Sequence, residues 1–478
     1  MVELEIEEFE EKERNVPPEI MRAIAHPGGF SLLIKGAPGT GKTSLALELL
    51  KKTGTKGIYL STRVSPDSLY NHFPWLEDAI EPINIIDTGQ IYVSSDLKVY
   101  SSAVSGMASF PERLAKRIED LEANVTIVVD SWDAITEQED VNKMKQLEAL
   151  ITELVREKEV NLILTSETLD VTYLDYMVDG VAWFNDVRVE GRRAREIEIS
   201  KLRMTKLEQP KYPFTLDGGR FNCFMPFGLK QIPKSPSKIE PIPDTRTRIS
   251  SGSKELDDVL NGGYKRGSFN VFEVSDDISS WGFEALVGFA IINAIAAGHP
   301  FVYVPCCGRT ENHLKKRIIP FVDEEAYKKC VKVFEVLPEE GAVLGENTIG
   351  LTSGSVGEDI RTIREYTAGL ESPVLSVLGI GSFEYPYRLA DTGQVGEAIK
   401  ELGRYVKSTK MRGNVDIVRV TDKLVLADEL ADMASTYIKL SSLDKTVVVC
   451  GIKPETELYN VDVEFTDGCP SLKITPFV

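Results

Sequence analysis

The sequence predicts an α/β protein built from two tandem domains, each with a mostly parallel, doubly wound sheet, of which the second is degenerate. Two observations support this fold class. Short β-branched runs alternate with helical patterns between residues 30 and 220, and strands separated by helices imply right-handed crossovers and a parallel sheet. The same alternation restarts near residue 268, after a segment without periodicity. The 478 residues allow two or three domains at roughly 150 residues each.

The first half contains the apolar runs expected of buried strands. The run Val125–Asp130 is almost wholly apolar, which suits a parallel strand covered on both faces. After it, apolar side chains recur every three or four positions and predict a helix with one buried stripe, formed by Met144, Leu147, Ile151 and Leu154. The predicted strands are Ser31–Lys35, Gly57–Ser61, Ile83–Asp87, Val125–Asp130, Val160–Thr165 and Val181–Phe184.

The second half repeats the pattern after a linker. Residues 228–247 are spaced with Pro and Lys and show neither helical nor strand periodicity, so the predicted domains are 1–227 and 248–478. A diverged tandem duplication accounts for the restart. The predicted elements are strand Ser268–Val274, helix Trp281–Ala297, strand Phe301–Pro305, helix Glu358–Gly369, strand Pro373–Ile380 and strand Lys445–Gly451.

Composition excludes several classes of protein. The 55 Lys and Arg against 74 Asp and Glu give a net charge of −19, which argues against bulk binding of nucleic acid or anionic membranes. Six cysteines without a C-x-x-C pair and four histidines leave little for a zinc site, and adjacent Cys306 and Cys307 are interpreted as buried small hydrophobes. The acidic N-terminus is unlike a targeting peptide, and the apolar stretch Ala285–Ala297 is too short for a membrane span. We therefore expect a cytoplasmic protein without a membrane segment.

A phosphate-binding motif stands at residues 36–43. The run matches the P-loop pattern G-x-x-x-x-G-K-[ST] in full, with a predicted strand before it and an amphipathic helix after it. Backbone N–H groups of such a loop, with the helix N-terminus, cradle phosphate oxygens. Lys42 is expected to neutralise the outer phosphates of ATP, and the Thr43 hydroxyl to bind Mg²⁺. The predicted nucleotide-binding residues are Gly36, Ala37, Pro38, Gly39, Thr40, Gly41, Lys42, Thr43 and Ser44.

Asp130 supplies the second part of the predicted site. It ends an apolar strand downstream of the P-loop, and a carboxylate at the carboxyl end of a core strand faces the crevice where the nucleotide lies. It is expected to hold Mg²⁺ through water, so the predicted metal residues are Thr43 and Asp130.

Three further features follow these motifs: the run Glu190–Arg195, the pair Lys201 and Arg203, and the run Tyr212–Phe214. With these features, the chain resembles the KaiC/GvpD-like group of RecA-superfamily P-loop ATPases over most of residues 30–220. The run Ile249–Asp258, followed by Gly262 and Gly263, is similar to the opening pattern of that group. The resemblance implies two tandem RecA-like P-loop NTPase domains.

The resemblance also implies an assembly. A K-x-R pair at the end of a late strand reaches the phosphates bound by a neighbouring subunit, and Lys201 and Arg203 match that pair. A cation acting on an adjacent γ-phosphate would link nucleotide state to assembly, so a homo-oligomer, dimer or hexamer, is expected. On spacing alone, solvated charges at an exposed strand end are the favoured interpretation of the two residues.

RecA-type ATPases, by the same resemblance, carry a glutamate after the second strand to activate water. Here Arg63 and Val64 stand at that place, and a guanidinium cannot act as a general base. None of the nearby acids, Asp67, Asp133 and Glu137, lies at the expected position. The sequence therefore predicts slow hydrolysis, with Arg63 contacting the γ-phosphate.

The second half lacks both parts of the site. The run Glu273–Gly282 replaces the P-loop, and either Ser280 or Trp281 takes the place of the lysine, depending on the alignment. The predicted strand Pro373–Ile380 is followed by Gly381 and Ser382 rather than an aspartate. These losses predict a domain that keeps the fold for packing or for binding a protein partner; a divergent site for another ligand is the alternative.

Together these features predict an MgATP-binding ATPase, slow without a partner, whose nucleotide state controls oligomer assembly or a regulatory partner. One alternative is a DNA recombination or repair accessory ATPase, although the composition shows no basic path and nucleic-acid binding is not favoured. Another is a non-hydrolysing ATP-binding scaffold. Arg192, Arg193 and Arg195 are interpreted as a solvated hairpin tip, with contact to nucleic acid as the alternative.

Overall fold

A computed structural model of the chain divides it into two compact units. The first unit comprises residues 1–225 with the terminal pair Phe477 and Val478, and the second comprises residues 226–476. The structure describes residues 14–54, 57–61, 64–76, 85–87, 125–136, 141–228, 230–278, 280–306, 308–336, 344–352, 354–389 and 393–478.

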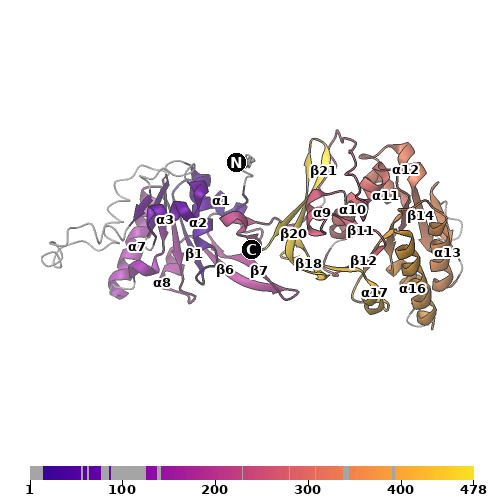
Figure 1. The fold of residues 1–478 in the computed structure, drawn as a ribbon. Helices are drawn as coiled ribbons and strands as arrows, with labels where there is room; N and C mark the ends of the chain where they lie inside the picture. Colours follow the sequence, from indigo (N-terminus) through magenta and orange to yellow (C-terminus); the bar gives the residue numbers. More distant parts are fainter. Residues whose placement is uncertain are drawn as a thin grey trace, which may run out of the picture. The chain divides into compact units, whose positions relative to one another are not determined.

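The first unit is built on a mixed sheet (Figure 1). Within the described residues, its strands lie in the order β3-β2-β4-β5-β1-β6-β7-β8-β9; those from β3 to β6 are parallel and the last three pair antiparallel. The strands are β1 (Phe30–Gly36), β2 (Gly57–Ser61), β3 (Ile85–Asp87), β4 (Thr126–Asp130), β5 (Asn161–Ser166), β6 (Gly180–Val189), β7 (Arg192–Leu202), β8 (Lys211–Thr215) and β9 (Asn222–Cys223).

Helices cover both faces of this sheet. One apolar cluster joins the sheet to α1 (Pro18–Ile24), α2 (Lys42–Thr53) and α3 (Pro66–His72). A second cluster joins the opposite face to α7 (Val141–Glu157) and α8 (Tyr173–Met177). Alternate residues of β4 enter the two clusters, Val128 the first and Val129 the second, as expected for a strand buried on both faces. The short helical turns are η1 (Pro74–Leu76), α6 (Asp133–Thr136) and η3 (Asp217–Gly219).

The second unit has a larger sheet of the same kind. Its described strands lie in the order β15-β14-β13-β16-β17-β12-β18-β19-β20-β21, parallel from β15 to β18 and antiparallel beyond. The strands are β12 (Ser268–Val274), β13 (Phe301–Val304), β14 (Val331–Val336), β15 (Thr348–Leu351), β16 (Leu375–Gly379), β17 (Val415–Val420), β18 (Thr436–Leu443), β19 (Thr446–Lys453), β20 (Glu455–Thr466) and β21 (Cys469–Pro476), with β10 (Arg248–Ile249) and β11 (Tyr264–Lys265) in a separate ribbon.

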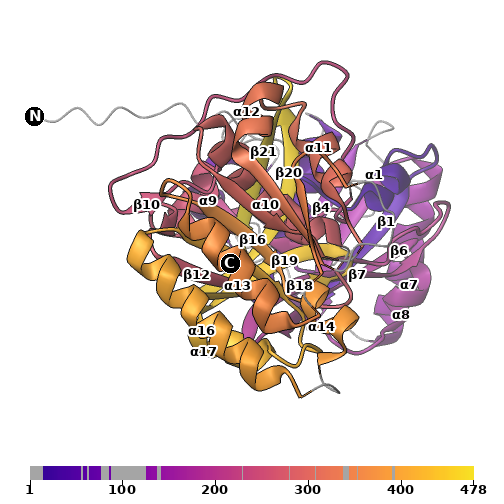
Figure 2. The ribbon, with the colours of Figure 1, turned by 90° about the vertical axis from the view of Figure 1, so that its right-hand side faces the viewer.

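Two helical layers cover the second sheet, and Figure 2 shows α10 to α12 on one side of its strands and α13, α16 and α17 on the other. The first layer contains α9 (Lys254–Val259), α10 (Ser280–Ala296), α11 (Glu311–Ile318) and α12 (Glu324–Cys330). The second contains α13 (Val356–Ala368), α14 (Gly381–Tyr387), α16 (Val395–Arg412) and α17 (Ala427–Met433).

The two sheets share one topology. In both, the first strand of the sheet along the chain, β1 or β12, lies in the middle. Four strands lie on one side of it in matching order, β3-β2-β4-β5 in the first sheet and β14-β13-β16-β17 in the second. The registers agree as well, because β1 pairs from Phe30 with Asn161, and β12 pairs from Ser268 with Val415, the first residues of β5 and β17. The second sheet adds β15 at its edge. This correspondence allows residues of the two units to be compared position by position.

The segment predicted as a linker, residues 228–247, contains no helix or strand among its described residues and is grouped with the second unit. It hydrogen-bonds along that unit: the Lys230 ammonium to Asp462, the Ile239 N–H to the Phe321 carbonyl, and the Ile242 N–H to the Asn293 side chain. Within the described ranges, no helix has the length and apolar composition that crossing a membrane requires.

Candidate functional site

The P-loop connects the carboxyl end of β1 to the first turn of α2. Gly39 and Gly41 have φ angles of 75° and 106°, which residues with a side chain rarely adopt. A Cβ atom at Gly36 would lie 2.7 Å from the Cβ of Phe184, so this position also requires glycine. Residues 37–39 form the exposed crest of the loop, whereas Thr40 and Lys42 are buried. Local geometry therefore explains each glycine of the motif.

The Lys42 side chain lies against its own loop. Its ammonium donates to the carbonyl oxygens of Gly36 at 2.8 Å and Ala37 at 2.9 Å, and the Thr40 hydroxyl donates to the Ala37 carbonyl. The buried ammonium is therefore already held at the loop, beside the N-terminus of α2, where an anion is favoured.

Asp130 lies at the end of β4 and accepts hydrogen bonds from three side chains. The Thr43 hydroxyl donates to its Oδ2 at 2.7 Å, the Tyr59 hydroxyl to the same oxygen at 2.6 Å, and the Thr165 hydroxyl to Oδ1 at 2.5 Å. Burial, and then the neighbouring charge of Asp130, raise the pKa of the Tyr59 hydroxyl, which therefore stays a donor. The structure thus brings the two predicted metal residues together.

Tyr59 and Thr165 were not predicted from the sequence. Each lies on a strand next to β4, and the parallel pairing of β2 and β5 with β4 places both beside Asp130. Their positions near the ends of predicted strands were the available signal, but only the strand order shows which strands are neighbours.

A buried lysine supports the strand that enters the loop. Lys35 donates to both carboxylate oxygens of Asp175, at 2.9 and 3.1 Å, and to the carbonyl of Asp170. Its ammonium also lies 4.5 Å from the ring centre of Trp183. Burial would raise the pKa of Asp175, but hydrogen bonds from Lys35 and Thr172 outweigh it, so the pKa is lowered.

Arg195 supports the loop from β7. Its guanidinium donates to the carbonyls of Gly39 and Thr40, both at 3.3 Å, and to the Val478 carbonyl at 2.7 Å. The interpretation of Arg195 as part of a solvated hairpin tip is therefore wrong, because a strand residue four positions from a turn still lies over the sheet. Arg193 is half-exposed and pairs with Asp186 at 2.8 Å.

The acids considered as substitutes for the catalytic glutamate are engaged or lie elsewhere. Asp133 accepts from the hydroxyls of Ser166 at 2.9 Å and Thr168 at 3.0 Å, and from the Glu167 N–H, so it holds the chain that follows β5. Asp67 is exposed in the first turn of α3. Arg63 and Glu137 lie outside the described residues.

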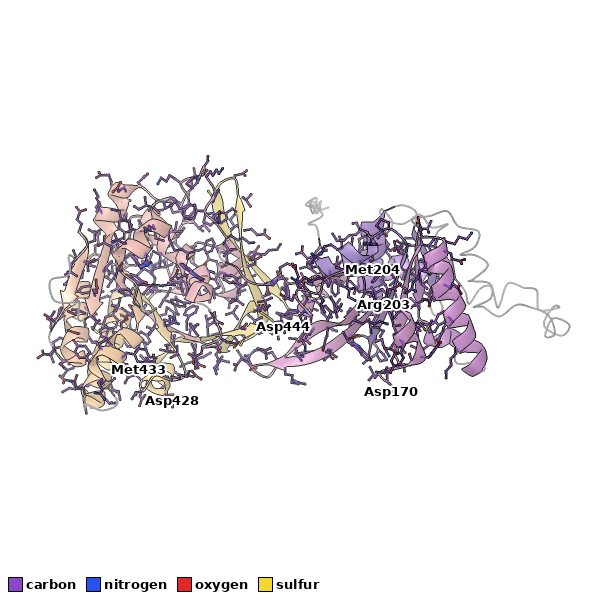
Figure 3. The ribbon with its side chains drawn as sticks, turned by 180° about the vertical axis from the view of Figure 1, so that it is seen from behind. Asp170, Arg203, Met204, Asp428, Met433 and Asp444 are labelled. Atoms are coloured by element: carbon purple, nitrogen blue, oxygen red, sulfur yellow. The ribbon has the colours of Figure 1, made fainter. Side chains whose placement is uncertain are left out.

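Lys201 and Arg203 lie at the end of β7 and bind α8 of the same chain. The Lys201 ammonium donates to the carbonyls of Asp175, Tyr176 and Val178 at 2.6–3.0 Å. Arg203, labelled in Figure 3, donates to the Tyr176 carbonyl and lies 3.6 Å from Asp179. Because β7 runs antiparallel to β6, this end of the strand pairs with the start of β6. The structure therefore does not bring the pair to the P-loop of its own chain.

The second unit replaces every part of this corner. By strand register, Gly379 of β16 stands where Asp130 stands in β4, and Arg419 of β17 takes the position of Thr165. A Cβ atom at Gly379 would lie 2.5 Å from the Cβ of Cys306, so no carboxylate fits there. This strand, β16, ends at Gly379, one residue before Ile380, where the sequence predicts its end.

The same register settles the alignment around the missing P-loop. Counting from β12 without a gap, Ser280 takes the position of Lys42 and Trp281 that of Thr43, and α10 begins at Ser280 as α2 begins at Lys42. The hydroxyl that would contact Mg²⁺ is thus replaced by an indole ring.

A P-loop between a central parallel strand and a helix, with an aspartate ending a nearby strand, defines a P-loop nucleoside triphosphatase of the RecA type, and the two units are tandem RecA-like domains. Residues 20–222 match the family described as "ATPase: KaiC". Together with the relatives below, this match confirms the predicted resemblance of the chain to RecA-superfamily P-loop ATPases of the KaiC/GvpD group.

Three relatives illustrate the similarity. Protein GvpD2 of Halobacterium salinarum is 25% identical over 494 residues, covering 97% of this chain and 96% of that protein. Protein GvpD1 of the same organism is 23% identical over 524 residues, with 97% and 96% covered. The circadian clock oscillator protein KaiC of Parathermosynechococcus lividus is 28% identical over 269 residues, covering 51% of this chain and 47% of KaiC.

Proposed function

We propose that the first unit binds MgATP and hydrolyses it slowly, and that its nucleotide state controls assembly of the chain or its binding to a regulatory partner. The observation that supports this most is the 2.7 Å contact between the Thr43 hydroxyl and the Asp130 carboxylate beside the P-loop. Hydroxyl and carboxylate oxygens are the ligands that Mg²⁺ prefers, so these residues fit the ion. Bound there, Mg²⁺ would neutralise charge on the outer phosphates.

Different residues of the first unit have different roles in binding MgATP. The backbone amides of residues 36–44 bind phosphate oxygens, and Lys42 exchanges its carbonyl partners for the terminal phosphates. Tyr59 and Thr165 fix the orientation of Asp130. Arg195 holds the loop and Lys35 holds the strand that enters it, so that little reordering is needed when ATP binds.

Slow hydrolysis follows from the acids near the site. Asp133, the described acid nearest in sequence to Asp130, holds the chain after β5 with both of its oxygens. A group that positions water typically contributes about 10²–10⁴ in rate, so we propose a turnover below about 1 s⁻¹ without a partner. Arg63 is proposed to contact the γ-phosphate.

Lys201 and Arg203 are proposed to act on the nucleotide of a neighbouring copy in a dimer or hexamer. They lie at the opposite end of the strand from their own P-loop, which is the arrangement that an action across a boundary requires. To act, they must release the α8 carbonyls, so assembly and the end of α8 would change together.

The decisive experiment measures bound nucleotide per chain and mass in solution together, with and without MgATP. The proposal predicts one nucleotide per chain and a mass that depends on nucleotide. No bound nucleotide would refute the assigned site. One bound nucleotide with an unchanged mass would refute control of assembly, and a pull-down of partners with and without ATP would then test the remaining branch.

A further inference from the structure

The second unit contains a cavity of about 170 Å³ at the corner that matches the metal corner of the first. Its lining includes Trp281, Gly379 and Arg419, the residues that replace the metal-binding threonine, the aspartate and the threonine that orients it. Figure 2 shows the two helices that border it, α10 and α11. The position that holds phosphate and metal in one unit is therefore open in the other, with a different lining.

Most of the lining is apolar. Side chains from α10, α11 and two strands face the cavity: Phe283, Val287, Ile291, Tyr303, Leu314 and Val377. Its volume is similar to that of an apolar protein cavity of about 150 Å³ that binds benzene. Such walls suit the flat, apolar body of a ligand and do not suit a hydrated triphosphate.

Charged residues also line this apolar cavity. Four charged residues of the lining are basic, and one, Glu284, is acidic. The basic residues are Arg309, Lys316, Arg317 and Arg419. Glu284 pairs with Arg309 and, at 3.1 Å, with Arg317, so one carboxylate serves two guanidinium groups.

The arginines also frame Trp281. The guanidinium carbons of Arg309 and Arg317 lie 4.9 and 4.3 Å from its ring centre. Burial, and then the charges of Arg317 and Arg419, lower the pKa of Arg309 to about 10. Cations held this close favour a further negative charge, which would reduce their repulsion.

We propose that this cavity binds a small organic anion, one with a flat apolar body and a single carboxylate, sulfonate or phosphate group, without a metal ion. The apolar walls take the body, and the guanidinium groups of Arg309 and Arg419 bind the anionic group. Gly379 leaves no carboxylate for Mg²⁺ at the position of Asp130. The site lies in the second unit and needs no nucleotide in the first.

The test is a fluorescence titration of the full chain with 8-anilinonaphthalene-1-sulfonate. Its uncharged analogue N-phenyl-1-naphthylamine has the same aromatic body without the sulfonate. We expect the sulfonate to bind at least about tenfold more tightly, the contribution of one charge-assisted hydrogen bond. Arg309→Gln and Arg419→Gln should each remove most of this preference while leaving the analogue bound.

Two further variants keep the test decisive. Arg317 has a third of its side chain exposed, so Arg317→Gln should fold even if a more buried arginine cannot be replaced, and it should reduce the preference by a smaller factor. Lys407→Gln, on exposed α16 surface away from the cavity, should change nothing. Circular dichroism and thermal melts identify misfolded variants.

Three results would overturn the proposal. Equal affinity for the two dyes would show that the cavity is only apolar. If the folded arginine variants preferred the sulfonate as strongly as Lys407→Gln does, the anion would bind elsewhere. Displacement of the sulfonate by MgATP from a Lys42→Ala chain, in which the first site is disabled, would assign the cavity to a nucleotide.

Discussion

The two units place different chemistry on matching backbones. In the first, the carboxyl ends of β1, β4 and β5 bring together Thr43, Asp130 and Thr165. In the second, the matching ends of β12, β16 and β17 are occupied by a tryptophan, a glycine and an arginine. The interiors of the strands are buried in both units and form the hydrophobic cores that stabilise the fold, whereas side chains at the strand ends add little to these cores. Such ends can therefore change without loss of topology.

Removing the lysine is the largest single test of the difference. Lys42→Ala should lower ATP affinity about 10²–10⁴-fold, because two charge-assisted hydrogen bonds contribute roughly 1.5–3 kcal/mol each. Ser280→Ala, at the matching position of the second unit, is the control and should leave affinity unchanged. Isothermal titration with ATP and Mg²⁺ measures both. Equal affinity in the two variants would mean that the P-loop is not the nucleotide site.

A buried acid distinguishes the interiors of the units. Asp416 is fully buried on β17, where the matching residue of β5 is the apolar Leu162. Burial raises the pKa of Asp416 to about 6, although hydrogen bonds from Thr409 and Tyr405 oppose the shift. The protonated carboxyl is therefore preferred in the fold, and its contribution is complete below the ordinary pKa near 4 and is lost as pH rises through 6.

Asp416→Asn should remove this pH dependence. Two pKa units correspond to about 3 kcal/mol at most, so the variant should gain up to that amount relative to the wild type between pH 4 and pH 8. Denaturant unfolding of both proteins across this range measures the difference. A difference that stays constant with pH would contradict the raised pKa.

Restoring the aspartate in the second unit should fail. Gly379→Asp places a Cβ atom against Cys306 in a packed corner and should destabilise the second unit by about 1–3 kcal/mol. Gly403→Asp, on the exposed side of α16 and away from this corner, is a control for adding the same residue to the unit. Thermal unfolding compares the two. A stable Gly379→Asp chain that binds a second MgATP would contradict this expectation.

Replacing the aspartate of the first unit should have the smallest effect on binding. Asp130→Asn keeps the shape of the side chain but removes the charge, and should weaken the Mg²⁺-dependent part of ATP binding about tenfold, the value of one charge-assisted contact. Titrations with and without EDTA isolate this part. An unchanged Mg²⁺ dependence would exclude Asp130 from the metal site.

The sequence predicted the fold class and the first site because both depend on local patterns. The P-loop is contiguous, so the glycine conformations and the start of α2 follow from residues 36–43 alone. The apolar run before Asp130 predicted its strand, which the structure places at Thr126–Asp130. Tyr59, Thr165 and Arg195 could not be predicted, since each contacts the site through a partner distant in the sequence.

In the second unit, the sequence alone determined that the P-loop and the aspartate are absent, because a missing motif is visible without a fold. Only the tertiary structure decided which residues stand in their places and that these residues surround a cavity. Trp281, Arg309 and Arg419 are separated by as many as 138 residues in the chain, as their numbers show, and they meet because parallel strands end at one edge. The order of strands in the sheet, which no local sequence pattern encodes, determines which of these residues lie close together.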